Sequence, residues 1–179
     1  MITTTQKPIL ISTLSDNSIK YTSAGCFFTD EKLVLCGYQA NKKNPSISGF
    51  GGKKNESDKT YIDTAIRETL EELFDIIPDK QIIKYIILKI IHKKIIVQNN
   101  YYMLVYTLDD LELILDILIQ KEITSKLYDV MPRTISELIF KRKINEISEI
   151  SHLCLLPNIN KINIHHDFVQ DINSFQLQK

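Results

Sequence analysis

The chain has 179 residues, of which 44% are hydrophobic and 25% are charged, and this balance is typical of one globular domain with a well-buried core. Its 22 basic and 22 acidic residues cancel, which argues against a protein that coats nucleic acid, because phosphate binding normally requires a basic excess. The three cysteines lack CxxC spacing and fit a reducing compartment. No apolar run is long enough to span a bilayer and no export signal is visible, so we expect a cytoplasmic protein without membrane contact.

The first predicted elements are strands at 8–13, 23–29 and 32–39, and the last two form a hairpin that turns at Asp30 and Glu31. Turn-forming residues dominate 41–52, which is predicted to be a loop. A helix is predicted from Thr60 to Phe74, because Thr60 and Asp63 can form a capping box and apolar residues recur on one face.

Beyond Pro78 the pattern changes again. Residues 81–98 are rich in β-branched side chains and are predicted to form one or two strands, and 99–108 another. Helices are predicted at 111–130, 133–143 and 166–177, with a last strand at 147–157. This order indicates a single α/β domain over 1–179, with a mixed sheet between helices.

The helix that starts at Thr60 carries three carboxylates on one face. Glu68 precedes Glu71 by three residues and Glu72 by four, so the three side chains form one stripe. Like charges at this spacing repel each other, and Arg67 is the only cation from 60 to 75. A hard divalent cation such as Mg²⁺ would offset the repulsion, because it binds carboxylate oxygens and completes its shell with water and substrate phosphates.

Two glycines, Gly51 and Gly52, precede this helix and would let the backbone approach a metal and a phosphate closely, with a carbonyl as a further ligand. The run from Gly52 to Asp75 resembles the signature of the Nudix hydrolase family. That signature is Gly, five residues, Glu, seven residues, then Arg-Glu-aliphatic-x-Glu-Glu-x-Gly-aliphatic. Residues 48–53, SGFGGK, are similar to the glycine approach of members that hydrolyse oxidised purine nucleoside triphosphates. The matching signature residues are Gly52, Arg67, Glu68, Glu71 and Glu72.

The chain departs from the signature at three places. It has one residue more between Gly52 and Arg67, which we assign to the loop before Thr60, so that the glutamates keep their register. The first glutamate of the signature has no clear counterpart, and we favour Asp58, with Glu56 as a fallback, as the carboxylate that orients Arg67. The closing glycine-aliphatic pair is Phe74-Asp75 in this chain, so we expect the helix to end without the usual left-handed residue, before Pro78.

The resemblance covers about 20–175 and implies a Nudix-like α/β/α sandwich with a mixed central sheet. It implies Mg²⁺, or Mn²⁺ in its place, bound by Glu68, Glu71, Glu72 and Gly52, and hydrolysis of a phosphoanhydride in a nucleoside triphosphate or a nucleoside diphosphate-linked substrate by attack of water on phosphorus. Either Glu68 or a downstream glutamate would be the general base. Further implied roles are phosphate charge stabilisation by Lys53, a structural role for Arg67, and an accessory metal-binding or base role for Glu146 or Glu149, which are equally well explained as surface glutamates.

Two other functions stay open at this point. The first is removal of an mRNA cap or an RNA 5′ pyrophosphate, which would be favoured by a basic groove from 84–94 or 141–143 to the acidic helix and disfavoured by an enclosed nucleobase pocket. The second is a catalytically idle module that binds a nucleotide or a protein. A minimal family member would need a much shorter link than 109–143, so we expect this helical insertion to be a lid, a wall that selects the substrate, or a dimer surface.

Overall fold

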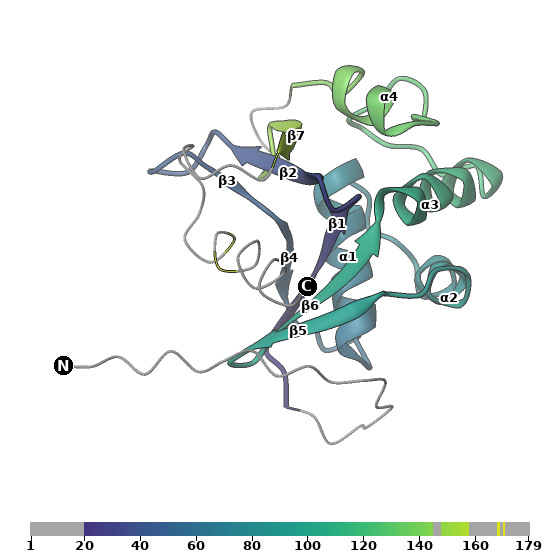
Figure 1. Ribbon diagram of the computed structural model, residues 1–179. Coiled ribbons are helices and arrows are strands. Elements are labelled where there is room, and N and C mark those ends of the chain that lie inside the picture. Colours follow the sequence, from purple (N-terminus) through teal and green to yellow (C-terminus); the bar gives the residue numbers. More distant parts are fainter. Residues whose placement is uncertain (1–19, 145–147, 158–167, 169, 171–179) are drawn as a thin grey trace.

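A seven-stranded mixed sheet forms the centre of the computed structural model, which describes residues 20–144, 148–157, 168 and 170 (Figure 1). Strand β1 pairs in parallel with β6 and antiparallel with β4 and β2. Strand β2 continues the sheet to β3 and β7, and β6 continues it to β5. The strands are β1 (Ser23–Thr29), β2 (Leu33–Gln39), β3 (Ser46–Ser48), β4 (Phe50–Lys53), β5 (Lys94–Gln98), β6 (Tyr101–Thr107) and β7 (His152–Pro157).

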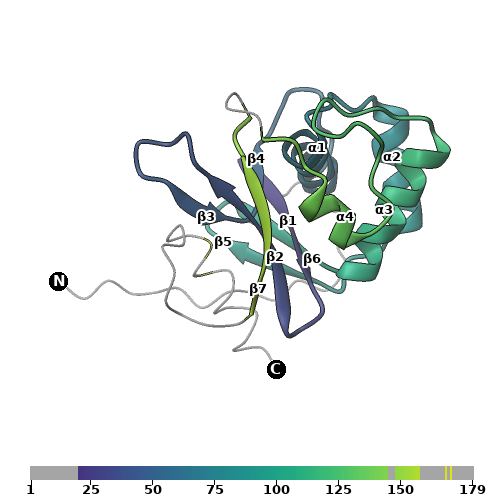
Figure 2. The same cartoon turned by 90° about the horizontal axis from the view of Figure 1, so that it is seen from above.

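The described helices are α1 (Tyr61–Phe74), α2 (Lys80–Lys89), α3 (Leu108–Gln120) and α4 (Ile135–Phe140), and all four lie on one side of the sheet (Figure 2). Side chains alternate across a strand, so Phe28 packs beneath these helices while Phe27 packs on the opposite face, against Phe168. This mixed sheet flanked by helices confirms the predicted α/β fold. No helix in the described part of the chain is long and apolar enough to cross a membrane.

Several predicted elements are confirmed. β1 has the predicted bounds, β2 follows it as a hairpin with Glu31 at positive φ in the turn, and β6 lies within 99–108. α1 begins as predicted: the Thr60 hydroxyl accepts from the Asp63 amide at 3.2 Å, and the Asp63 carboxylate accepts from the Thr60 amide at 2.7 Å. The three cysteines are free thiols, two of them buried.

The prediction for 81–98 was wrong in its first half, because α2 occupies it and only 94–98 forms a strand, β5. Asp79 caps α2 by accepting from the amides of Gln81 and Ile82, both at 2.8 Å. Ile82, Ile83 and Ile86 then fall on one helical face and pack in the core. Burial of this face outweighs the β preference of isoleucine, which is weak compared with packing.

Other boundaries also differ from the sequence-based expectation. The predicted loop at 41–52 contains β3 and part of β4, because these residues pair with β2 and β1. The helix predicted over 111–130 starts earlier, after the cap residue Thr107, and ends at Gln120. Two further predicted elements are shorter than expected: α4 within 133–143, and β7 within 147–157. The strand predicted at 8–13 and the helix predicted at 166–177 lie outside the described residues, apart from Phe168 and Gln170 in the latter.

α1 ends before Pro78 as expected, but the expectation that its end would lack a left-handed residue was wrong. Asp75 adopts a left-handed conformation, with φ 50° and ψ 46°, one position after the place where the signature has its glycine. Aspartate tolerates this conformation better than most residues. Its amide donates to the carbonyl of Glu71 at 2.8 Å, so the helix keeps a left-handed cap without glycine.

Candidate functional site

Arg67 is buried under the loop that leads into α1, and its guanidinium joins three carboxylates. Its Nη2 lies 2.9 Å from Asp58, and its Nη1 lies 2.9 Å from Glu68 and 3.0 Å from Glu71. Nη2 also donates to the carbonyl of Lys53 at 2.9 Å. One side chain therefore fixes the end of β4, the preceding loop and the carboxylate face of α1 relative to one another.

Asp58 is the carboxylate that holds Arg67 in place, and only 6% of it is exposed. Besides Arg67 it accepts from the amide of Asn55 at 2.9 Å and from the hydroxyl of Thr64 at 2.8 Å. Burial alone would raise the pKa of Asp58, but the hydrogen bonds from Arg67, Asn55 and Thr64 outweigh it and hold that pKa below its ordinary value. Glu56, the fallback, is exposed on the same loop.

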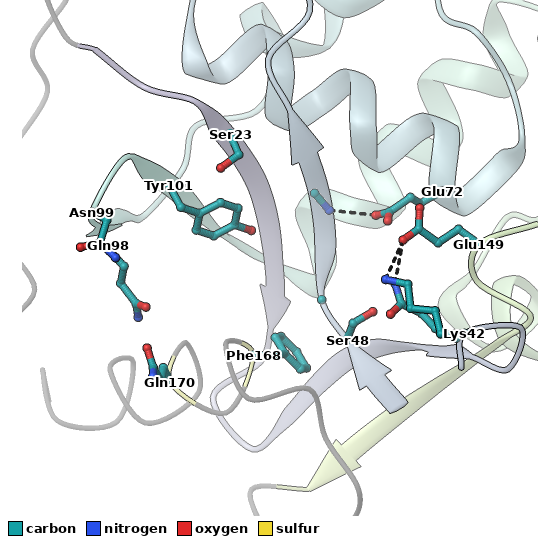
Figure 3. Close-up of a pocket in the computed structure, with 13 residues that line it drawn as sticks. Ser23, Lys42, Ser48, Glu72, Gln98, Asn99, Tyr101, Glu149, Phe168 and Gln170 are labelled. Carbon is teal, nitrogen blue, oxygen red and sulfur yellow. Dashed lines mark hydrogen bonds and ion pairs between the residues drawn. The ribbon is translucent and has the colours of Figure 1, made fainter. Parts of the chain in front are cut away.

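Among the carboxylates of this region, Glu72 has the pKa that is shifted furthest from its ordinary value. It accepts from the amide of Gly51 at 2.8 Å, yet burial first and the nearby charge of Glu149 second raise its pKa well above the ordinary value. Glu149 is held from the other side, by Lys42 at 3.0 Å and by the amide nitrogen of Gln39 at 3.0 Å. Two carboxylates from distant parts of the chain thus face each other across a short gap (Figure 3).

The glycines of β4 permit this close approach. Gly51 has φ +158°, and a Cβ there would overlap the backbone of Ala24 and Gly25 in β1. A Cβ at Gly52 would occupy the position of the Glu68 carboxylate. The backbone of β4 therefore lies directly against the carboxylates of α1.

A cavity of about 360 Å³ opens beside Glu72 and Glu149 on the sheet. In Figure 3, Lys42, Glu72 and Glu149 gather on one side of it, and Gln98, Asn99 and Gln170 lie on the other. Two aromatic rings, Tyr101 and Phe168, complete an environment that mixes charge, carboxamides and apolar surface. The lining residues are Ser23, Gln39, Lys42, Ser48, Gly49, Gly51, Glu72, Gln98, Asn99, Tyr101, Glu149, Phe168 and Gln170.

The residues singled out from the sequence fall into three groups. Glu72, Glu149 and Gly51 line the cavity. Gly52 and Glu68 touch each other beside it, while Glu71 is bound to Arg67 on the partly exposed side of α1. Lys53 has an exposed side chain and contributes its carbonyl to Arg67, and Glu146 lies outside the described residues.

Sequence reasoning missed several cavity residues, chiefly Lys42, Gln39, Tyr101 and Gln98. Lys42 lies in the turn between β2 and β3, so recognising β3 would have placed it beside the end of β2. Tyr101 lies in the cavity lining because β6 pairs with β1 in parallel, which places Tyr101 opposite Ser23. No local motif in the sequence marks either residue.

The carboxylate oxygens of Glu68 and Glu72 are chemically suited to bind a divalent cation. Oxygen ligands suit Mg²⁺, and burial raises the pKa of Glu68 as it does that of Glu72, although Arg67 opposes the effect at Glu68. A positive ion near both would relieve this unfavourable burial of charge. Within the described residues no three His, Cys, Asp or Glu side chains are gathered closely enough to form a complete site, so water and substrate phosphate would have to complete the shell.

The basic residues that would make an RNA groove do not lie in the cavity. Among its described lining residues Lys42 is the only lysine or arginine. Lys141 pairs with Glu137, Lys143 pairs with Asp129, and Arg142 is buried.

No protein-family model matches the chain, and no curated protein matches it. Among solved structures, it is similar to a hydrolase of the NUDIX family from Clostridium perfringens, with 15% identity, a TM-score of 0.41, and coverage of 89% of this chain and 99% of that one. It is also similar to the NUDIX domain of Shewanella oneidensis NrtR, complexed with ADP ribose, with 14% identity, a TM-score of 0.42, and coverage of 89% and 88%. Because the identities and TM-scores are low, the function proposed below rests on the residues of the site.

Proposed function

We propose that this chain is a Mg²⁺-dependent hydrolase of the Nudix type that cleaves a diphosphate linkage in a small nucleotide. The observation that carries the proposal is the buried Glu72 carboxylate, held by the amide of Gly51 and facing Glu149 at the edge of the cavity. The match of Gly52, Arg67 and the glutamates of α1 to the Nudix signature supports it.

Each residue of the site has a task in this reaction. Mg²⁺ held at this site would supply positive charge at the reacting phosphate and would acidify an attacking water. Glu72, Glu68 and the carbonyl of Gly52 would hold it, and water and substrate phosphate would complete its shell. Arg67 and Asp58 would position Glu68 and Glu71, because both glutamates contact the Arg67 guanidinium directly.

Glu149 is our candidate for the group that accepts the proton of the attacking water, since it lines the cavity, whereas Glu68 is not among the lining residues. Lys42 lies against Glu149 and lines the cavity, so it can also neutralise charge that develops on a phosphate oxygen. The exposed Lys53, which the resemblance suggested for that task, stays a prediction.

The cavity favours a nucleoside over an RNA end. A volume of about 360 Å³ is at the lower end of typical small-ligand sites, and its carboxamides can hydrogen-bond to a base while Tyr101 and Phe168 offer ring faces or edges. An RNA strand would require several cations along its path. Lys42 is the one cation of the described lining, which favours a compact nucleotide.

The test is hydrolysis of a panel of nucleoside triphosphates, nucleoside diphosphate-linked compounds, dinucleotides and capped RNA with Mg²⁺. We expect turnover of at least one nucleotide and a fall of roughly 100-fold or more in kcat for Glu72→Gln, as metal-dependent chemistry loses its ligand. Glu56→Gln is the matched control, because Glu56 is exposed on the loop before α1, and it should behave as wild type. If no compound is hydrolysed, or if Glu72→Gln equals wild type, the proposal is wrong.

A further inference from the structure

The carboxyl end of α1 is completed by residues from far along the chain. The last four carbonyls of a helix lack partners within it, and here all four of them, from 71 to 74, are hydrogen-bonded. The amide of Asp75 donates to the first. Arg142 donates to the second and third through Nη2 and Nη1, and the hydroxyl of Ser125 donates to the fourth.

Arg142 is a buried cation at the carboxyl end of α1. It is only 8% exposed, and the carbonyls that it contacts form the negative end of the α1 dipole, which favours a cation. Its Nη1 also lies 3.4 Å from the hydroxyl of Tyr128, which donates in turn to the carbonyl of Leu138 in α4. The guanidinium thus links α1 to segment 121–143.

One nitrogen atom of Arg142 hydrogen-bonds to both backbone segments that carry the cavity carboxylates. Nη2 donates to the carbonyl of Glu72 at 2.9 Å and to the carbonyl of Ile150 at 2.8 Å. Ile150 directly follows Glu149. The backbones that position Glu72 and Glu149 are therefore tied to the same atom, while the two carboxylates repel each other.

We propose that Arg142 is a positioning residue of the site, which holds Glu72 and Glu149 at the separation that a divalent ion and a nucleotide phosphate require. Segment 121–143 then serves to support the end of α1. The inference rests on the proposed function, because only a reaction at these two carboxylates makes their separation matter. It also accounts for the loss of the closing glycine, whose part is taken by Asp75, Ser125 and Arg142.

The test compares Arg142→Met and Arg142→Lys with two controls. Ser125→Ala removes the partner of the last α1 carbonyl but leaves the bridge intact, and Arg133→Met makes the same chemical change at an exposed arginine. Folding is checked by thermal unfolding, and if the Met variant fails to fold, the Lys variant, which keeps the charge, decides. The two readouts are Mn²⁺ affinity by electron paramagnetic resonance and amide hydrogen exchange at Asp75 and Ser151.

We expect Arg142→Met to weaken Mn²⁺ binding about 10- to 100-fold, as loss of a residue that supports metal ligands usually does. Arg142→Lys should restore part of the Mn²⁺ affinity, and both controls should bind Mn²⁺ as wild type does. Exchange at Asp75 and Ser151 should accelerate in the Met variant more than in Ser125→Ala. Equal Mn²⁺ affinity in Arg142→Met and Ser125→Ala would overturn the positioning role. If wild type binds no Mn²⁺, the proposed function fails, and unchanged exchange in the Met variant would separately show that Arg142 does not hold the two segments together.

Discussion

Replacing Asp58 with asparagine removes the charge opposite Arg67 while preserving the shape of the side chain. The carboxylate accepts from four nitrogen or oxygen donors: Nε and Nη2 of Arg67, the amide of Asn55 and the hydroxyl of Thr64. In asparagine the NH₂ group replaces one acceptor oxygen and must face a donor. At least one of these hydrogen bonds is lost, and the remaining ones go to a neutral oxygen instead of a negatively charged one.

The magnitude follows from burial. The two side chains of the pair are 10% and 2% exposed, and breaking a buried pair by changing one partner costs about 3–5 kcal/mol. Arg67 keeps Glu68 and Glu71 as partners, so the guanidinium is not left unpaired. We therefore expect Asp58→Asn to lower the free energy of unfolding by about 3 kcal/mol, at the lower end of that range.

Urea denaturation at neutral pH measures this loss, with Asp129→Asn as the matched control. Asp129 pairs with Lys143 at the surface and its side chain is 86% exposed, so the same substitution there should cost at most about 1 kcal/mol. The pKa of Asp58 is lowered in the folded protein, so its contribution is present above the unfolded value and is lost as pH falls through the folded value. The difference between wild type and Asp58→Asn should therefore shrink below about pH 4.

A loss in Asp58→Asn no larger than that in Asp129→Asn would refute the reasoning. It would mean that Glu68 and Glu71 hold Arg67 without help. A difference that stays constant down to about pH 2 would refute the electrostatic part alone.

Three further predictions follow from contacts at single positions. Gly52→Ala should reduce hydrolysis at least tenfold with a loss of stability under about 1 kcal/mol, because the three atoms nearest to the new methyl group all belong to the flexible Glu68 carboxylate, which can move aside; nucleotide turnover and urea denaturation measure the two. Thr60→Ala should cost about 1 kcal/mol in the same denaturation assay, because it removes the cap of α1. Cys154 should react first with a thiol reagent in the folded protein, since it is half-buried and Cys36 lowers its pKa, whereas the contact with Cys154 and, second, burial raise the pKa of Cys36; equal labelling rates of both would contradict this.

The parts of the site that could be predicted are those encoded locally. The capping box at Thr60 and Asp63 and the apolar face of α1 depend on spacings within one helix, and the structure has them as expected. The contact of Asp58 with Arg67 was also accessible, because the loop between them is short and the register of the helix was known. Short-range geometry limits the number of alternatives in such cases.

The failures share a different cause, which is dependence on partners distant in sequence. A glycine-rich stretch forms β4 because Gly51 and Gly52 lie opposite Gly25 and Ala24 of β1. Nothing within 41–52 identifies that partner. The run of isoleucines in α2 was assigned by β propensity, although Asp79 after Pro78 is a capping signal that a helical reading would have used.

Each of the three differences from the Nudix signature that the chain resembles has a counterpart in the contacts of this structure. The loop before Thr60 contains a turn in which the amide of Asp58 donates to the carbonyl of Asn55 at 3.0 Å, and the same turn presents Asp58 to Arg67. The missing glycine is offset at Asp75 and at Arg142. The first compensation is local and leaves α1 in register, but the last depends on a residue of segment 121–143. If that support is required, a change that moves Arg142 should disturb Glu72 even though no residue of the signature is altered.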